Sequence, residues 1–253
     1  MQDPPVLLAS DVHLGVAPPE TERAFLRWLE HCGNEASQVV INGDLFDFWF
    51  EYRSVVPRGH TRVLGALSAL VDSGIPVTLV GGNHDWWGGD FLTDEIGVGF
   101  LREPTVLEIK GKKTLLAHGD GLGAGDAGYR LLKTVLRGSV TRFAFRWLHP
   151  DLGAWVARRV SKTTVHSLRP TDRQMARARL LEEWATKELE SSPDLDQVVL
   201  GHTHVPVLKE IFPGRHYVNS GDWLLNQSYA VFPQGQPPQL KDWRDGEASE
   251  SDG

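Results

Sequence analysis

Short apolar runs and amphipathic stretches alternate along the first third of the chain. Residues 5–10 and 38–42 are continuous apolar runs of the length that buried strands have. Residues 21–32 and 61–72 instead repeat apolar side chains at helical spacing, which predicts helices with one buried face. Strands that alternate with helices in this way predict an α/β fold.

Later strands are predicted to pair as hairpins. Residues 105–109 and 114–117 are apolar and flank Lys110-Gly111-Lys112-Lys113, a sequence typical of a tight turn. The other predicted strands cover residues 76–80, 197–200, 207–211, 216–219 and 228–232. We therefore expect mixed sheets, with both parallel and antiparallel pairs.

Residues 126–191 interrupt this pattern, because they are helical in composition and contain no convincing strand. We interpret them as a helical cap inserted into a core formed by residues 1–125 and 192–243.

The insertion is also basic. Residues 129–180 contain 12 Lys or Arg, interspersed with apolar side chains, and only two acids. Such helices suit an acylated phosphate ester or the face of an anionic bilayer. An ordinary cap, in contrast, would pack its apolar face on the core and expose its charges.

The composition narrows the class of protein. The chain has 253 residues, a formal net charge of −7 and Cys32 as its one cysteine, which excludes an internal disulfide and a cysteine-based zinc site. No signal peptide or membrane-spanning run is evident, so we expect a cytoplasmic protein, with peripheral association to the inner membrane face through the cap. The negative charge argues against binding of duplex nucleic acid. The acidic residues 244–253 are expected to form a disordered tail.

Five short polar motifs each follow a predicted strand. They are Asp11-Val12-His13, Gly43-Asp44, Gly82-Asn83-His84-Asp85, His118-Gly119-Asp120 and Gly201-His202-Thr203-His204. Side chains at the carboxyl ends of strands converge at one edge of an α/β sheet. Carboxylate, amide oxygen and imidazole are the ligands that remain for divalent cations in a chain without spare thiols. One such motif alone is weak evidence, but five in order predict two adjacent divalent cations, a type of site that moves phosphoryl groups.

Glycine precedes three of the expected ligands, at Gly43, Gly82 and Gly201. A glycine permits backbone angles or close approaches that a Cβ would block, so we expect tight packing at these points. Asp44 follows such a turn and can place one carboxylate oxygen on each of two cations.

Together, these motifs resemble the signature of the calcineurin-like metallophosphoesterase superfamily, from about residue 6 to residue 243. The resemblance implies a four-layer α/β/β/α sandwich of two mixed sheets with the helical cap inserted. It also implies two divalent metal ions, with Mn²⁺ favoured and iron or zinc as alternatives. By motif, one ion takes Asp11, His13, Asp44 and His204, and the other takes Asp44, Asn83, His118 and His202, so that Asp44 bridges them.

Within that superfamily, three segments are closer to the UDP-2,3-diacylglucosamine hydrolases of lipid A synthesis. They are Gly43-Asp44-Leu45-Phe46-Asp47-Phe48-Trp49, His118-Gly119-Asp120 followed by Asp126-Ala127-Gly128-Tyr129, and Arg158-Arg159-Val160-Ser161-Lys162. In those enzymes such an insertion caps the site and receives the acyl chains. The resemblance implies a UDP-linked glycolipid that is cleaved to UMP and an acylated sugar 1-phosphate. The residues expected to bind it are Arg158, Ser161 and Lys162 at the phosphates and Asp126 and Tyr129 at the sugar.

One position departs from that group. Those hydrolases commonly have Arg after the Asn ligand, whereas this chain has His84. Asn-His is the pattern of the wider superfamily, whose His protonates the leaving oxygen, so we expect His84 to act as general acid beside Asn83. Asp85 is grouped with these catalytic residues. Both Asp85 and Asp120 are expected to orient the metal ligands or His84 without contacting the metals themselves.

The departure leaves other functions open. The runner-up is a phosphatase or phosphodiesterase for soluble nucleotides, in which the cap is a simple lid. A non-catalytic scaffold with the same fold is a third hypothesis, but such relatives usually lose ligands, whereas this chain retains every one. A metal-dependent hydrolase of phosphoester or pyrophosphate bonds is therefore the predicted enzyme.

Overall fold

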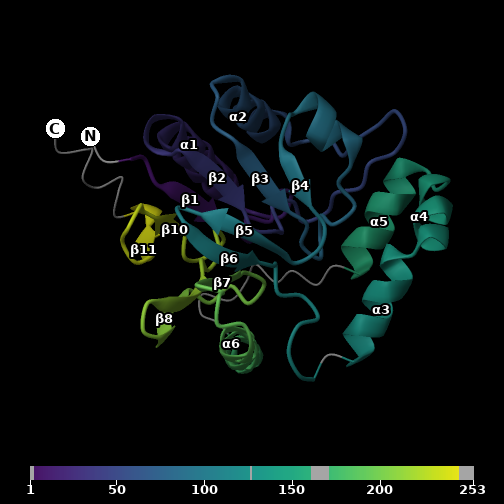
Figure 1. The fold of residues 1–253 in the computed structure, drawn as a ribbon. Helices are drawn as coiled ribbons and strands as arrows, with labels where there is room; N and C mark the ends of the chain where they lie inside the picture. The colour runs from purple at the N-terminus through teal and green to yellow at the C-terminus, as the bar shows by residue number, and fades with distance from the viewer. Residues whose placement is uncertain (1–2, 126, 161–170, 245–253) are drawn as a thin grey trace.

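Two β-sheets lie face to face in the computed structural model (Figure 1), which describes residues 3–125, 127–160 and 171–244 without the side chains of residues 157–160. The first sheet contains β1 (Val6–Ala9), β2 (Gln38–Ile41), β3 (Val77–Val80), β4 (Gly99–Leu101), β10 (Ser228–Phe232) and β11 (Gln239–Asp242). The second contains β5 (Thr105–Ile109), β6 (Lys112–Leu116), β7 (Gln197–Leu200), β8 (Val207–Phe212) and β9 (Arg215–Asn219).

Both sheets are mixed, as predicted. The first has the order β11-β10-β1-β2-β3-β4, in which β1 to β4 are parallel and β10 runs antiparallel to both β1 and β11. The second has the order β5-β6-β7-β9-β8, with parallel pairs at its centre and an antiparallel hairpin at each edge. The parallel strands bring several carboxyl ends to the same edge, where α/β sheets hold their ligands.

Helices cover the outer face of each sheet (Figure 1). α1 (Pro19–Glu35) and α2 (Thr61–Asp72) share an apolar cluster with the first sheet, and α6 (Asp172–Ser191) shares one with the second. A third apolar cluster fills the space between the sheets. The four-layer α/β/β/α sandwich that the resemblance implies is therefore confirmed.

Alternating side chains along β1 show why the sequence forms these layers. Leu7 and Ala9 join the cluster beneath α1 and α2, whereas Val6 and Leu8 join the cluster between the sheets. Because successive side chains of a strand point to opposite faces, a strand covered on both faces needs apolar residues at every position. This is the continuous apolar run that the sequence shows.

The structure also contains elements that the apolar pattern did not indicate. β4 has three residues and begins at a glycine, and β11 has exposed polar side chains, so neither shows a strong strand pattern. A five-residue π-helix, η1 (Phe91–Glu95), follows the third polar motif. The first predicted helix begins earlier than expected, at Pro19, because proline suits the first turn of a helix.

The described part of the insertion is helical, as predicted, and consists of α3 (Ala127–Arg137), α4 (Ser139–Arg146), α5 (Pro150–Val160) and α6. α3, α4 and α5 stand together at one end of the sandwich, apart from α6 (Figure 1). The cap in this structure is therefore α3–α5. The cap was expected to include all of residues 126–191. α6 is instead a layer of the sandwich, because its apolar face, including Leu181 and Leu189, is buried on the second sheet. None of the helices in the described ranges has the length and apolar character needed to cross a membrane.

Candidate metal centre

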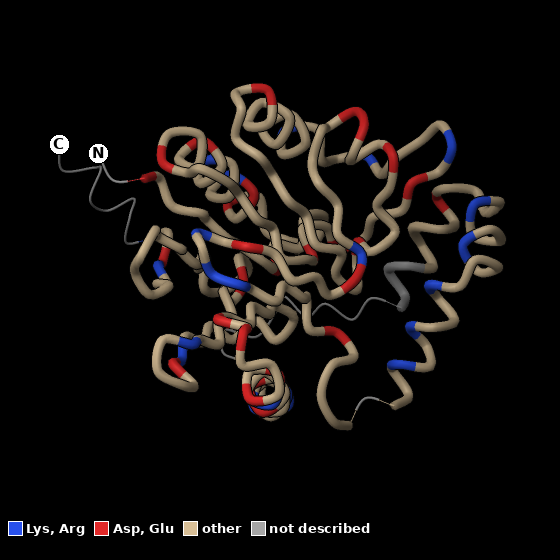
Figure 2. The backbone as a smooth tube through the Cα atoms, in the orientation of Figure 1, with Lys and Arg blue, Asp and Glu red and all other residues tan. Residues whose placement is uncertain are grey.

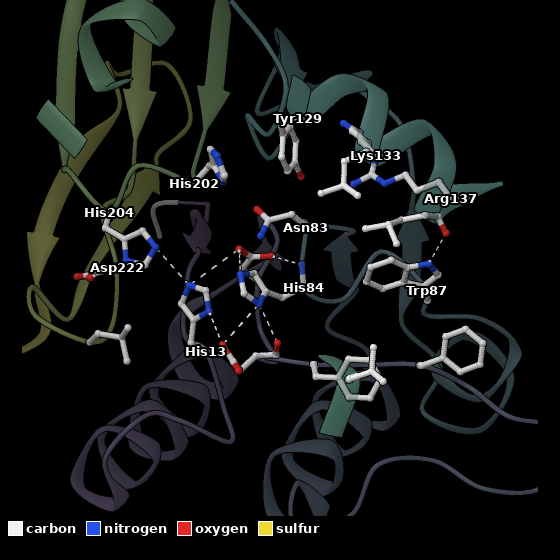
Figure 3. Close-up of a pocket in the computed structure, with 18 of the residues that line it drawn as sticks. His13, Asn83, His84, Trp87, Tyr129, Lys133, Arg137, His202, His204 and Asp222 are labelled. Atoms are coloured by element: carbon white, nitrogen blue, oxygen red, sulfur yellow. Dashed lines mark hydrogen bonds and ion pairs between the residues drawn. The ribbon is translucent and has the colours of Figure 1, made fainter. Parts of the chain in front are cut away.

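Side chains that follow five strands meet at one edge of the sandwich, and Figure 3 labels His13, Asn83, His202 and His204 among them. The carboxyl ends of β1, β2, β3, β6 and β7 lead respectively to Asp11, Asp44, Asn83, His118 and His202. Positive φ angles between 52° and 69° occur at Asp11, His13, Asp44, His202 and His204. Residues other than glycine adopt this left-handed conformation rarely, and it persists where the surroundings enforce it, often at functional sites.

Two glycines permit this convergence. A Cβ added to Gly201 would lie 2.7 Å from Asp11 Oδ2. A Cβ on Gly82 would overlap the carboxylate of Asp44. The expectation that glycine allows close approach at these points is confirmed, because an expected ligand occupies the space of each missing side chain.

The expected ligands form two adjoining groups. Within each group the ligand atoms lie within 4.8 Å of one another, and the groups are Asp11, His13 and His204, and Asp44, His118 and His202. Asp44 reaches both, because its Oδ2 is 3.1 Å from His118 Nε2 and 3.9 Å from His13 Nε2. Asn83 joins the second group through its Oδ1, which is 3.3 Å from His118 Nε2. All seven side chains predicted as ligands are thus brought together, with Asp44 between the groups.

The chemistry of this cluster suits divalent cations. The Nε2 atoms of His13 and His204 lie 3.3 Å apart, and the neighbouring Asp11 and Asp44 are almost completely buried. Buried carboxylates at this density need a cation or protons to offset their charge. Imidazole nitrogen, carboxylate and amide oxygen are ligands that Mn²⁺, Fe²⁺ and Zn²⁺ accept. The residues present therefore fit the metal ions that the resemblance implies.

Hydrogen bonds on the far side of the rings orient two imidazoles. His118 Nδ1 lies 2.9 Å from the backbone oxygen of Asn42, and His204 Nδ1 lies 3.0 Å from Oδ2 of Asp222. Both partners are acceptors, so each Nδ1 carries a proton that it donates. Each Nε2 then faces the ligand cluster without a proton in the neutral ring, as metal-binding histidines require.

Asp222 is a site residue that was not predicted. It is fully buried and lies beside His204 at the edge of the cavity (Figure 3). The pair Gly221-Asp222 follows β9 in the way that Gly43-Asp44 follows β2. The sequence signal that could have identified Asp222 was therefore a Gly-Asp pair that follows a strand.

Neighbouring charges shift the pKa values of these imidazoles in opposite directions. Burial alone would lower the pKa of His118, but the Asp44 carboxylate raises it to about 10. Burial likewise opposes the effect of Asp222, whose hydrogen bond raises the pKa of His204 to about 9. Burial and the charge on His118 lower the pKa of His202 to about 3. In the metal-free protein, His118 and His204 are therefore protonated at neutral pH, whereas His202 is neutral.

Binding of Mn²⁺ to the metal-free protein is expected to release close to two protons per chain at pH 7, one each from His118 and His204, because a metal-bound imidazole is neutral. The apparent affinity for the metal should therefore rise with pH. In the metal-free fold, the raised pKa of His204 contributes stability that is fully present below pH 6.5 and is lost as the pH rises through about 9. Titrating Mn²⁺ into weakly buffered protein while following the pH measures the release. A pH-independent affinity would contradict this assignment.

Asp85 lies behind the centre. Its fully buried carboxylate accepts hydrogen bonds from the backbone N–H groups of Gly82 (2.8 Å), Leu45 (2.7 Å), Asp44 (3.3 Å) and Phe46 (3.3 Å). These bonds hold the turn that carries Asp44, which agrees with the expectation that Asp85 orients a ligand. It does not line the cavity, so its hydrogen bonds give it a positioning role rather than a contact with substrate.

His84 faces the cavity beside the ligands (Figure 3). Its Nδ1 donates to the backbone oxygen of Asp47 at 2.8 Å, and its Nε2 lies 3.9 Å from Asp44 Oδ2. The Asp47 carboxylate is also close, 3.5 Å from the same Nδ1. Burial lowers the pKa of His84, but the charges of Asp44 and Asp47 outweigh burial and raise it overall. The ring can therefore hold a proton next to the ligand cluster.

A cavity of about 730 Å³ opens over the ligand cluster. Beyond the ligands its wall is largely apolar and aromatic, formed by Phe48, Phe50, Trp87, Leu132, Leu136, Phe145, Val156, Leu224 and Leu225. Four cationic side chains line the same space: Lys133, Arg137, Arg142 and Arg173. The cavity thus combines a metal-ligand cluster, positive charge and an extended apolar surface. The cap supplies three of the four cationic side chains and four of the nine apolar ones.

The predicted substrate-binding residues of the cap can be located only in part. Tyr129 lines the cavity, and its hydroxyl donates to Asp120 Oδ2 at 3.1 Å. Asp126, Ser161 and Lys162 lie outside the described residues, as does the side chain of Arg158.

Lys133 and Arg137 are cavity residues that were not predicted. They follow Tyr129 at intervals of four residues in α3, so all three project from one face of the helix (Figure 3). This spacing was visible in the sequence, but it pointed to the site only once the orientation of α3 was known.

Asp120 connects the cap to the core. Its Oδ2 lies 2.8 Å from Lys133 Nζ and 3.0 Å from an Arg137 nitrogen, besides accepting from Tyr129. Burial would raise the pKa of Asp120, but Arg137 and the other nearby cations lower it, so the carboxylate stays charged. Asp120 was expected to orient metal ligands or His84. Its carboxylate instead holds three side chains of α3 over the site.

Known proteins are similar to this chain over most of its length. The chain matches the calcineurin-like phosphoesterase family over residues 4–206. A UDP-2,3-diacylglucosamine hydrolase from Porphyromonas gingivalis is 32% identical, with 90% of this chain and 93% of that protein covered. Another, from Ectopseudomonas mendocina, is 31% identical, with 91% and 95% covered. Among solved structures, Yfce, a phosphoesterase from E. coli, is 16% identical with a TM-score of 0.42, covering 90% of this chain and 87% of that one.

The family match includes every predicted metal ligand, from Asp11 to His204. These two hydrolases are matched over almost their whole length, so the similarity extends well beyond the ligand motifs. The chain therefore belongs to the calcineurin-like phosphoesterase family and is a metal-dependent phosphoester hydrolase.

Proposed function

We propose that this protein is a dinuclear hydrolase that cleaves the pyrophosphate of a UDP-linked diacyl glycolipid, UDP-2,3-diacylglucosamine or a close analogue. The observation that carries the proposal is the cavity, in which a wall of nine apolar or aromatic side chains continues from the ligand cluster. Fatty acyl chains need such a wall, whereas a soluble nucleotide does not. The names of relatives that cover the same length support this substrate class.

The metal ligands proposed for this reaction are those that converge at the strand ends. One cation would be held by Asp11, His13, Asp44 and His204, and the other by Asp44, Asn83, His118 and His202. We propose Mn²⁺ as the metal, because the family resemblance favours it and it accepts carboxylate, amide and imidazole ligands. When bound, such a pair of cations offsets the charge of the phosphoryl group and activates water as a nucleophile.

The side chains around the cluster have separate tasks in the proposed reaction. Water attacks the uridine-side phosphorus, and the bond from that phosphorus to the bridging oxygen breaks, which releases UMP. His84 supplies a proton to the oxygen that leaves with the acylated sugar phosphate. Lys133 and Arg137 line the cavity and would form charge-assisted hydrogen bonds with the phosphates of the substrate.

The outer face of the cap suits contact with the membrane that holds such a substrate. Large apolar side chains are exposed there at Leu131, Val135, Val140, Phe143 and Trp147. Figure 2 shows basic residues along the same helices, and Arg130, Arg142 and Arg146 are exposed. Helices that expose apolar and basic side chains together bind to anionic membrane surfaces. We therefore include peripheral membrane association through α3 and α4 in the proposal.

Two adjacent leucines of α3 allow a matched test. Leu132 lines the cavity and is 45% exposed, whereas Leu131 is 69% exposed and does not line it. Leu132→Glu is expected to lower kcat/KM for UDP-2,3-diacylglucosamine by about 10–100-fold, since the buried contact of one leucine contributes about 1.5–3 kcal/mol. Leu131→Glu should leave hydrolysis of the detergent-dispersed lipid unchanged and should reduce binding to vesicles containing anionic lipid.

The assay uses the Mn²⁺-loaded protein and compares UDP-2,3-diacylglucosamine with UDP-N-acetylglucosamine and bis-p-nitrophenyl phosphate. Both variants should hydrolyse the small diester at the wild-type rate, because the metal ligands are untouched. Faster cleavage of the soluble nucleotide than of the lipid, with Leu132→Glu no worse than Leu131→Glu, would overturn the lipid substrate and favour a soluble-nucleotide hydrolase.

A further inference from the structure

We propose that Asp222 is a positioning residue that selects the metal-binding tautomer of His204. The proposal rests on the metal centre proposed above, but it is independent of the substrate. The Asp222 Oδ2 atom lies 3.0 Å from His204 Nδ1. On the other side of the ring, Nε2 is 3.6 Å from Asp11 Oδ1 and 3.3 Å from His13 Nε2. A proton held on Nδ1 by the carboxylate leaves the Nε2 lone pair facing the cluster.

The second oxygen of Asp222 fixes how the carboxylate is oriented. Its Oδ1 accepts from the backbone N–H groups of Leu225 at 3.2 Å and Asn226 at 3.0 Å, and from Asn226 Nδ2 at 2.9 Å. Asn226 Nδ2 also donates to the backbone oxygen of His204 at 3.0 Å. Three donors therefore surround one oxygen of Asp222, so the other oxygen is the one presented to the ring.

The arrangement also connects the ligand to the cavity wall. Leu224 and Leu225, in the turn that Asp222 caps, line the apolar part of the cavity. His118, in the other group, is oriented by a backbone oxygen instead, that of Asn42. Asp222 is thus a side chain through which the tautomer of one metal-binding histidine can be changed without altering the other.

The decisive variant is Asp222→Asn. Asparagine has the same shape and keeps one oxygen for the three donors of the turn, so its amide nitrogen must face His204. Because that nitrogen only donates, His204 Nδ1 has to accept, and the ring proton moves to Nε2, where it blocks the metal. We expect one of the two Mn²⁺ ions to bind about 10–100-fold more weakly, with the other unchanged. Calorimetric titration of the metal-free protein with Mn²⁺ separates the two binding events.

Two comparisons distinguish positioning from a merely structural role. Asn226→Ala removes one of the three donors but keeps the carboxylate and both backbone N–H donors, so it should weaken Mn²⁺ binding much less than Asp222→Asn does. In a His204→Ala background, adding Asp222→Asn should cause no further loss. Asp194→Asn, at an exposed aspartate paired with Lys113, is the matched surface control. Equal losses in Asn226→Ala and Asp222→Asn, or additive losses with His204→Ala, would overturn the proposal.

A measurement on the unmodified protein removes dependence on the folding of any variant. In ¹⁵N-labelled protein loaded with diamagnetic Zn²⁺, the nitrogen chemical shifts of His204 report which ring nitrogen carries the proton. A hydrogen-bonded proton on Nδ1 is expected. A proton on Nε2, or Zn²⁺ bound at Nδ1, would contradict the role assigned to Asp222 whatever the substrate of the enzyme is.

Discussion

An Asp44→Ala variant is expected to lose both divalent cations and all measurable hydrolysis. Asp44 is the carboxylate that reaches both ligand groups, with its Oδ2 3.1 Å from His118 Nε2 and 3.9 Å from His13 Nε2. Removing it leaves the second group with only neutral ligands and leaves Asp11 as the one carboxylate of the first. Two cations held close together without the anion between them would repel each other strongly.

Elemental analysis after loading with excess Mn²⁺ measures the effect directly: two ions per chain are expected in the wild type and none in the variant. Binding of ligand to the native state raises its stability, by about 2.7 kcal/mol at 100 times Kd. The Mn²⁺-dependent rise in Tm should therefore disappear as well. Asp72→Ala, at an exposed aspartate at the end of α2, should keep both ions. Retention of two ions by Asp44→Ala would exclude a bridging role.

Replacing His84 with Ala is expected to lower turnover by about 10²–10⁴-fold, the usual contribution of a general acid. Metal content should remain close to wild type, because the ligand sets proposed for the two cations do not include His84. The loss should be large for a sugar phosphate leaving group and small for p-nitrophenolate, which needs little protonation. Equal losses on both substrates would assign His84 to substrate positioning instead.

The pH profile provides a second readout for His84. Its pKa is raised above the ordinary value of 6.5 by Asp44 and Asp47, despite the opposing effect of burial, so the ring keeps its proton to a higher pH than an ordinary histidine does. The wild-type rate with a poor leaving group should therefore fall on the alkaline side as this proton is lost. In His84→Ala that alkaline limb should be absent. Thermal unfolding of the variant checks that loss of the hydrogen bond to the Asp47 backbone has not unfolded the site.

The fold and the ligand set could be predicted from the sequence because both are recorded in local patterns. Four consecutive apolar residues in β1 reflect a strand covered on both faces, and the polar motif after it marks the carboxyl end where ligands collect. The role of the glycines beside the ligands could be predicted for the same reason. Gly82 and Gly201 stand next to ligands because other ligands occupy the space of their missing side chains.

The sequence alone could not show which residues approach these ligands from elsewhere in the chain. Asp222 meets His204 across 18 residues, and Arg137 meets Asp120 across 17. Neither pair has a fixed spacing that a motif could record. The extent of the cap could not be predicted either, because α3 and α6 are both amphipathic in sequence. Only packing shows that α6 buries its apolar face on the second sheet, whereas α3 presents Leu132 and Lys133 to the cavity.

The sequence by itself therefore determined the metal-ligand chemistry and the layers that carry it, since each depends on residues adjacent in the chain or on the two-residue period of a strand. Tertiary structure decided the tautomer of His204, the task of Asp120 and the composition of the cavity wall. These depend on distances between segments that are set by the packing of whole elements. Hydrogen bonds and burial in the folded chain, and not residue type alone, give three carboxylates different partners. Asp120 contacts the cap, Asp222 contacts His204, and Asp44 lies among the proposed metal ligands.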